Sequence, residues 1–245
     1  MTAEAYPPIS DYALISDCHT AALVSRDDSI DWCSFHRFEA RPVFGRLLDW
    51  GKGGFFRIAP RDDYEATRRY LPGTNILETR FQTGSGAILL TDCVAVKDDP
   101  GHPDHRLIRL VRCLEGEVAV KVKFEPRFDY GLTTPRLEQL DSDLAVVYGG
   151  ADALVLQTEL AIGHAEEHGS VEPATAAQLG RAPIEQLSYR RHAAEAAQRR
   201  AHARKRVHPL FLPRADVCWI LGRQLARSQL PLDGRSPIRS SCPPR

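Results

Sequence analysis

Residues 106–124, RLIRLVRCLEGEVAVKVKF, hold the strongest secondary-structure signal in the chain. In the second half of this stretch Val118, Val120 and Val122 alternate with other residues, and two lysines point the opposite way. This two-residue period is typical of a strand with one buried face. The run before it is also rich in apolar and β-branched residues, and the Glu115-Gly116 step between the two runs predicts a tight hairpin turn.

Similar short runs occur through the first two-thirds of the chain, and they are rich in β-branched and aromatic residues. They are Thr20–Ser25, Ser29–Cys33, Gly54–Ala59, Asn75–Gln82, Ala87–Val94, Leu144–Tyr148 and Ala153–Leu160. Gly149-Gly150 between the last two predicts another hairpin. Only Phe44–Trp50, with Pro42 near its start and Gly51 at its end, predicts a short helix. The fold class that we expect is all-β, an antiparallel β-sandwich.

The composition is that of an ordinary globular protein. The 245 residues are 43% hydrophobic and 26% charged, with a formal net charge of zero, which argues against nucleic acid as a partner of the whole chain. No run has the 18 or so apolar residues of a membrane helix, and the N-terminus resembles no secretory signal, so we expect a cytoplasmic location and no membrane partner. The spacing of the six cysteines matches no zinc pattern, and four of them lie in apolar stretches that predict burial.

The charge is divided unevenly between two parts of the chain. Residues 1–160 hold 18 Lys/Arg and 25 Asp/Glu, a balance of −7, and residues 161–245 hold 14 and 7, a balance of +7. We therefore expect a β-sandwich domain over 1–162 and a weakly ordered, partly helical basic tail over 163–245. In the tail, Tyr189–Arg206 has high helix propensity but no apolar stripe, and the Pro- and Ser-rich end has the composition of a disordered segment.

The first part of the chain resembles a known family. Ile9–Trp32 (ISDYALISDCHTAALVSRDDSIDW) closely resembles the opening of the bacterial and archaeal branch of glycoside hydrolase family 15, the glucoamylase- and trehalase-like proteins. Further matching motifs follow in the family's order: Arg37-Phe38-Glu39, Pro42–Leu48, Arg68–Thr79, Thr91-Asp92 and Pro126–Gly131. The resemblance covers residues 9 to about 162 and is almost lost beyond Ile162.

The resemblance implies a non-catalytic β-domain. In such enzymes a β-sandwich precedes a helical barrel, and the barrel carries the general acid and general base that hydrolyse α-glucosidic bonds with inversion. No catalytic residue is carried over to this chain, and we predict that the chain alone is inactive. A frameshifted or truncated reading of a longer gene, with a non-functional product, would explain the abrupt loss of resemblance. A stand-alone carbohydrate-binding or subunit module is the other alternative.

Asp31, Trp32 and Arg37 form the most interesting candidate site. Stacking of a sugar on Trp32 and bidentate hydrogen bonds from Arg37 suit the entrance of a sugar site where the sandwich meets a barrel. The structural alternative is that Trp32 and Phe38 fill the core while Arg37 pairs with a carboxylate. By resemblance, the partners are trehalose or another α-glucan and a separately encoded barrel domain. The family usually has proline at the position of His36, which puts the shape of this loop in question.

No cofactor or metal site is predicted. His36 near Cys33 lacks a third group to orient a nucleophile. Asp17 and His19 flank Cys18 on what we expect to be a strand, and we interpret them as hydrogen-bonded structural residues. The segment Asp98–His105 gathers acids and histidines, and it is interpreted as a solvated turn between two strands.

Overall fold

The computed structural model describes residues 6–95, 105–141 and 144–158, and the backbone of 184–191. Its elements run in this order: η1 (Ile9–Asp11), β1 (Ala13–Ser16), β2 (Ala21–Val24), β3 (Ser29–Ser34), β4 (Phe55–Pro60), β5 (Tyr64–Tyr70), β6 (Leu77–Thr83), β7 (Gly86–Val94), β8 (His105–Gly116), β9 (Val120–Glu125), η2 (Asp129–Gly131), β10 (Arg136–Gln139), β11 (Leu144–Gly149), β12 (Asp152–Gln157) and β13 (Ile184–Arg191). The predicted all-β class is confirmed. No described helix is long and apolar enough to cross a membrane.

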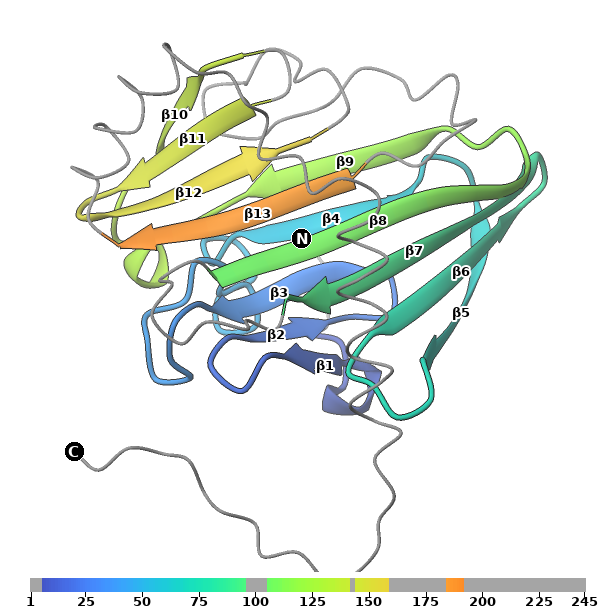
Figure 1. Cartoon of the computed structure of the whole chain (residues 1–245), viewed down its shortest axis with the longest axis horizontal. Coiled ribbons are helices and arrows are strands. Elements are labelled where there is room, and N and C mark those ends of the chain that lie inside the picture. Colours follow the sequence, from blue (N-terminus) through green and yellow to red (C-terminus); the bar gives the residue numbers. More distant parts are fainter. Residues whose placement is uncertain (1–5, 96–104, 142–143, 159–183, 192–245) are drawn as a thin grey trace, which may run out of the picture.

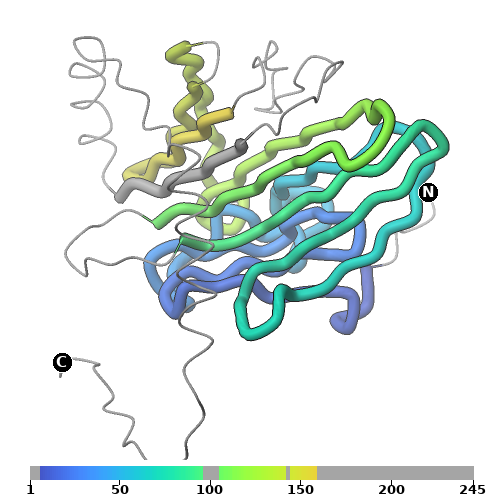
Figure 2. Tube along the Cα trace, turned by 45° about the vertical axis from the view of Figure 1, so that its right-hand side comes forward, coloured from blue at the N-terminus to red at the C-terminus, as the bar shows by residue number. Residues whose placement is uncertain are grey.

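Two antiparallel sheets form the two layers of a sandwich (Figure 1). The smaller sheet has the order β1-β2-β3-β4-β9, and the larger has the order β10-β11-β12-β13-β8-β7-β6-β5. Figure 2, turned by 45°, shows the blue strands of the first sheet lying beneath the green strands of the second. Each strand predicted from a run of β-branched and aromatic residues in the first 160 residues corresponds to one observed strand, and the predicted hairpin at Gly149-Gly150 joins β11 to β12.

The predicted hairpin at Glu115-Gly116 is wrong. β8 pairs with β7 and β13, whereas β9 pairs with β4 in the other sheet, so the chain crosses between the layers after Gly116. Gly116 has φ +64°, and a Cβ there would clash with the carbonyl oxygen of Ser85. Only glycine fits such a close approach of two backbones at a positive φ.

The short helix predicted over Phe44–Trp50 is also wrong. Phe44 instead makes an isolated bridge with Cys33, and the amide of Gly45 donates to the carbonyl of Gly53. The amide of Leu47 donates to the carbonyl of Asp31 in β3. These long-range bonds use the backbone groups that a helix would need, so only a turn forms over residues 46–48.

β13 comes from the part of the chain predicted to be a weakly ordered tail. Its backbone pairs with β12 on one side and with β8 on the other, so it fills a central place in the larger sheet. The first three residues of the helix predicted over Tyr189–Arg206 are therefore part of a strand, β13, and the prediction is wrong for them. The rest of that predicted helix, and the predicted disordered end, lie outside the described residues.

The core lies between the two sheets. Phe44, Phe56 and Phe124 pack on one another with ring centroids 5.2–6.2 Å apart, and all three are fully buried. The larger sheet contributes aliphatic and aromatic side chains such as Phe81 and Leu107 to the same cluster. On β9 the valines are buried as the alternation predicted. Of the four cysteines in the described residues, Cys33 and Cys93 are buried, Cys113 is partly buried and Cys18 is exposed.

Arg109 of β8 is a fully buried cation inside this core. Its guanidinium makes a two-pronged ion pair with the Asp92 carboxylate of β7, at 2.9 and 3.1 Å. It also donates to two carbonyls of the other layer, those of Phe56 in β4 at 2.7 Å and of Asp28 at 2.9 Å. Desolvation raises the pKa of the buried Asp28 carboxyl well above its usual range, and the nearby Asp92 raises it further. One side chain therefore joins both sheets.

We expect Arg109→Met to destabilise the domain strongly, because it leaves the Asp92 carboxylate buried without its cation and removes two inter-sheet hydrogen bonds. Breaking one partner of such a buried pair costs about 3–5 kcal/mol. Urea unfolding followed by circular dichroism measures the change. The matched control is Arg112→Met on the same strand, since Arg112 is exposed. Equal midpoints for the two variants would contradict this role for Arg109.

Candidate functional site

Asp31, the first predicted site residue, is buried by an irregularity in β3. Trp32 pairs with Leu23 of β2, but Ile30 pairs with the next residue, Val24, so Asp31 is an extra residue in the ladder. Such a β-bulge changes the direction in which side chains point. As a result Ile30 and Cys33 both face the core, and the Asp31 side chain is only 1% exposed.

The Asp31 carboxylate holds neighbouring segments together. It accepts hydrogen bonds from the Ser29 hydroxyl at 2.5 Å and from the Tyr12 phenol at 2.8 Å, and the Arg46 guanidinium lies 3.9 Å away. Burial raises the pKa of Asp31, and these donors and the cation oppose the rise. Burial and the hydrogen bond to Asp31 raise the pKa of Tyr12. Asp31 is therefore a positioning residue with no face open to a ligand.

Arg46 and Trp50 form a stacked pair that the sequence did not single out. The Arg46 guanidinium lies 3.8 Å from the Trp50 ring centroid and 4.2 Å from that of Phe55. The ring of Tyr6 packs against Trp50 edge-on, and its hydroxyl accepts the Trp50 amide hydrogen. A planar cation between aromatic faces keeps a fixed orientation. The charge of Asp31 thereby orients an aromatic surface through Arg46.

The structure does not bring Arg37 to Asp31. The Arg37 side chain is 68% exposed and pairs with Glu39 at 3.5 Å, while Trp32 is partly buried on β3. The structural alternative is wrong for Phe38, which is 55% exposed and outside the core. Arg37 and Phe38 remain open to solvent, as a contact with another molecule would require.

Two loops at one end of the sandwich pack together, and we call residues 35–54 and 127–133 the loop surface. The Arg127 amide donates to the Val43 carbonyl, and Arg41 pairs with Asp129 at 2.9 Å. The loop surface exposes several large apolar side chains: Phe38 (55%), Leu48 (60%), Tyr130 (49%) and Leu132 (82%). Exposed apolar side chains gathered on adjoining loops are typical of a protein contact or a ligand site.

The loop surface also contains strained backbone. Asp129 has φ 53° and Tyr130 has φ 56°, and His36 in the other loop has φ 75°. Left-handed backbone is uncommon for residues other than glycine, and for a bulky one such as Tyr130 it has an energetic cost. The Tyr130 side chain is exposed, so burial of its ring does not offset this energetic cost. Strain of this kind, held by surrounding contacts, is found most often at functional sites.

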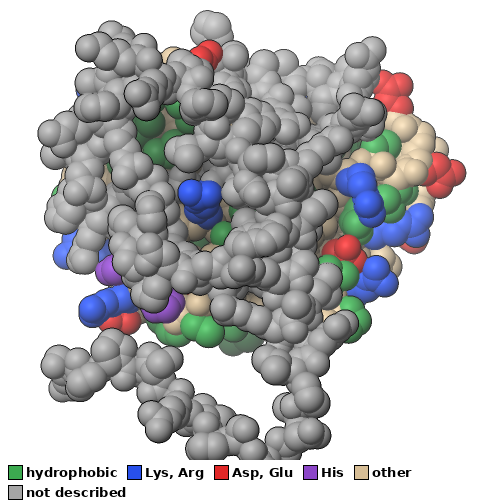
Figure 3. Space-filling model, in the orientation of Figure 1, with side chains coloured by type: hydrophobic (Ala, Val, Ile, Leu, Met, Phe, Trp, Pro, Cys, Tyr) green, Lys and Arg blue, Asp and Glu red, His purple; other side chains and the backbone are tan. Residues whose placement is uncertain are grey.

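A cluster of histidines from separate segments lies beside the loop surface. The Nδ1 of His36 is 3.3 Å from the Nε2 of His105, and the ring of His19 lies 6.2 Å from that of His105. On its other side, the Nδ1 of His105 is 3.1 Å from the Thr20 hydroxyl and 3.5 Å from the Asp17 carboxylate. Histidine side chains are visible at the lower left of the space-filling view, beside charged and hydrophobic ones (Figure 3).

This cluster was not predicted from the sequence, because its residues come from segments that are far apart in the chain and each was interpreted separately. His105 is 6% exposed at the start of β8, so the prediction that it belongs to a solvated turn is wrong. The remainder of that predicted turn, 98–104, lies outside the described residues. The strand predicted around Cys18 is also wrong, because Asp17 and His19 lie in the loop between β1 and β2. Asp17 accepts hydrogen bonds from the amides of His19 and Thr20, as interpreted for a structural residue.

Within the described residues, no three metal-ligating side chains converge on a point that could hold an ion. The two-histidine contact instead resembles a hydrogen-bonded pair, with His105 oriented by Asp17. The Cys33 thiol is buried and its pKa is raised by desolvation, so it is no nucleophile. The cluster therefore joins the β1–β2 loop and the loop of His36 to the start of β8.

We expect Asp17→Asn to destabilise the domain by about 1–2 kcal/mol at pH 7, because the hydrogen bond from His105 to a charged acceptor is lost. Burial raises the pKa of Asp17, but the bonds from His105, Thr20 and His19 outweigh it and lower the pKa overall. A lowered folded-state pKa contributes stability above the unfolded value of about 3.9, which is lost as the pH falls below it.

The difference between the wild type and Asp17→Asn should therefore shrink between pH 5 and pH 3, as measured by chemical unfolding at each pH. The control is Asp49→Asn, since Asp49 accepts two backbone amides in the same way from an exposed position. A gap for Asp17→Asn that stays constant with pH would show that the charge on Asp17 is unimportant.

The sequence of this chain is similar to a family of N-terminal domains and to several trehalases. A family model described as "Trehalase-like, N-terminal" matches residues 1–207. A trehalase of Mycolicibacterium smegmatis is 38% identical over 143 residues, which are 51% of this chain and 21% of that protein. A trehalase of Mycobacterium tuberculosis is 36% identical, over 51% of this chain and 21% of the relative. One of Thermoplasma volcanium is 32% identical, over 57% and 23%. The chain spans about a fifth of the length of these relatives, and it belongs to the family of trehalase-like N-terminal domains.

Proposed function

We propose that this chain is the non-catalytic N-terminal domain of an inverting α-glucosidic-bond hydrolase of glycoside hydrolase family 15, with trehalose or a related α-glucan as the substrate of the whole enzyme. One observation carries the proposal. The family match covers residues 1–207, whereas the matched part is only about a fifth of the relatives that are named trehalases. The chemistry then belongs to the part of those proteins that this chain does not match.

The buried carboxylates of the described residues support a non-catalytic role. A glycosidase needs a pair of carboxyl groups, and inversion places them roughly 6.5–9.5 Å apart with room for a water between them. Asp92 instead pairs with Arg109 inside the core, and Asp31 accepts bonds from Tyr12 and Ser29. Carboxylates engaged in this way hold strands together and leave no space for a sugar.

In this proposal the loop surface packs against the catalytic domain. Its loops carry three of the motifs on which the family resemblance rests, Arg37-Phe38-Glu39, Pro42–Leu48 and all but the first residue of Pro126–Gly131. They also expose apolar side chains on a strained, hydrogen-bonded backbone. Trp32 and Arg37 are the proposed sugar-facing residues at that contact. Asp31 acts indirectly, by orienting Arg46 and the Trp50 ring. The cytoplasmic location stays a prediction.

We expect the purified chain to release no glucose from trehalose or maltose, because the residues that the structure describes supply no general acid and base pair. The measurement is a coupled glucose assay, with the complete M. smegmatis trehalase as the positive control and buffer as the blank. Glucose release above the blank that purifies together with the chain would overturn the non-catalytic assignment.

The proposed contact is tested by adding the chain to the part of the M. smegmatis trehalase that lies beyond the matched residues. We expect the two to co-elute in size-exclusion chromatography, and Leu132→Glu to abolish co-elution, because a charge at a buried apolar contact is costly. Leu114→Glu is the control, since Leu114 is also exposed but lies on β8 outside the loop surface. Equal effects of the two variants, or no complex with the wild type, would contradict docking through the loop surface.

A further inference from the structure

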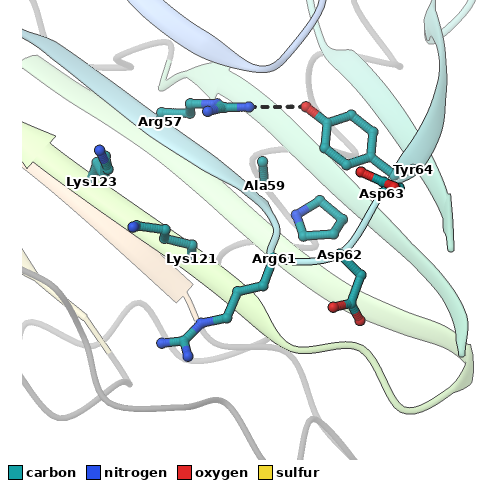
Figure 4. Close-up of a pocket in the computed structure, with 9 residues that line it drawn as sticks. Arg57, Ala59, Arg61, Asp62, Asp63, Tyr64, Lys121 and Lys123 are labelled. Atoms are coloured by element: carbon teal, nitrogen blue, oxygen red, sulfur yellow. Dashed lines mark hydrogen bonds between the residues drawn. The ribbon is translucent and has the colours of Figure 1, made fainter.

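A basic hollow lies on the outer face of the smaller sheet (Figure 4). It has a volume of about 800 Å³, within the range of about 300–1,000 Å³ that is typical of small-molecule sites. Four cations line it, Arg57 of β4, Arg61 just after β4, and Lys121 and Lys123 of β9. Asp62, Asp63 and Tyr64 close it from the β4–β5 connection and the start of β5.

The strand register explains both the hollow and its charge. Phe56 and Ile58 point into the core, so Arg57 and Ala59 point outward, beside their partners Lys123 and Lys121 on β9. Ala59 contributes only a methyl group, which leaves space between the longer side chains. Arg57 is held in place by Asp27 at 3.1 Å and by the Tyr64 hydroxyl at 3.0 Å, as the dashed line in Figure 4 shows.

The pairing of Arg57 with Lys123 is unfavourable for folding alone. Like charges directly opposite each other on neighbouring strands destabilise a sheet. Asp27 compensates Arg57, but no ion pair within the described residues involves Lys123. An anion bound between the two strands would remove this repulsion, and a phosphate group accepts several charge-assisted hydrogen bonds from Lys and Arg at once.

The two carboxylates of the hollow add a second requirement. Asp62 and Asp63 are exposed acceptors that would repel a bare anion, but they suit a ligand that donates hydroxyl hydrogens. A ligand that combines a phosphate with several hydroxyl groups satisfies both halves of the lining. We propose that this hollow binds a phosphorylated sugar, with the phosphate between Arg57 and Lys123 and the hydroxyls near the two aspartates.

This inference does not depend on the hydrolase assignment, because it concerns binding to the purified chain rather than turnover. The test is isothermal titration of the full chain with glucose 6-phosphate, inorganic phosphate and glucose. We expect glucose 6-phosphate to bind at least about tenfold more tightly than inorganic phosphate, the gain from one well-formed hydrogen-bonded contact, and glucose to bind no more tightly than phosphate. The binding should weaken with added salt.

Substitutions distinguish the cationic part of the site, which would bind the phosphate, from the two aspartates, which would bind the hydroxyl groups. Lys123→Gln should weaken both glucose 6-phosphate and phosphate by about tenfold, because it removes one charge-assisted bond. The double variant Asp62→Asn, Asp63→Asn should weaken glucose 6-phosphate but not phosphate. Lys52→Gln, an exposed lysine of the loop surface, is the control and should leave both affinities unchanged. The unfolding midpoint of each variant is measured as a control, and we expect these surface changes to leave it unchanged.

Several outcomes would overturn the proposal: no binding of glucose 6-phosphate, equal affinities for glucose 6-phosphate and phosphate, or affinities that Lys123→Gln leaves unchanged. Backbone amide shifts in an NMR titration provide a second readout. We expect the shifts to concentrate in residues 57–64 and 121–123, and shifts confined to the loop surface would place the ligand elsewhere and refute this site.

Discussion

The buried guanidinium of Arg109 is the interaction on which the rest of the domain depends. A charge that is fully removed from water is tolerated only when its hydrogen-bonding groups are satisfied and a counter-charge lies in contact. Asp92 supplies the counter-charge from the neighbouring strand, and carbonyls of Phe56 and Asp28 supply acceptors from the opposite sheet. The two layers are therefore held at one relative position by directional bonds, in addition to the apolar core.

That fixed relation between the layers has consequences for the surface. The bulge that buries Asp31 lies in β3, in the same sheet as β4, whose Phe56 carbonyl Arg109 engages. The Asp31 carboxylate lies near the Arg46 guanidinium, which in turn stacks on the Trp50 ring. The strained backbone at Tyr130 is held by contacts within the loop surface, the ion pair of Arg41 with Asp129 and the hydrogen bond from the Arg127 amide to the Val43 carbonyl. The basic hollow is on the outer face of the same sheet, where Arg57 lies two residues along β4 from Phe55, the ring on which Arg46 stacks.

Strands whose buried face is marked by alternation or by a run of valines and isoleucines could be predicted, and β7, β9 and β11 are examples. β5 was missed because its sequence, YEATRRY, is partly or fully exposed throughout and so shows no apolar period. β10 is a short edge strand with the same lack of pattern. The predicted helix over Phe44–Trp50 failed for another reason, since its backbone bonds go to distant residues that no local pattern reveals.

The all-β class, most of the strands and the family resemblance could be recognised in the sequence, because side-chain period and motif order are local properties of the chain. Which strands are neighbours depends on tertiary packing, as β8 and β9 show by lying in different sheets. Tertiary packing also determines where the candidate residues lie and what they contact. Asp31 is buried by a bulge, and His36, His105 and Asp17 meet although they are far apart in sequence. Such contacts depend on the packing of two sheets, which no single segment encodes.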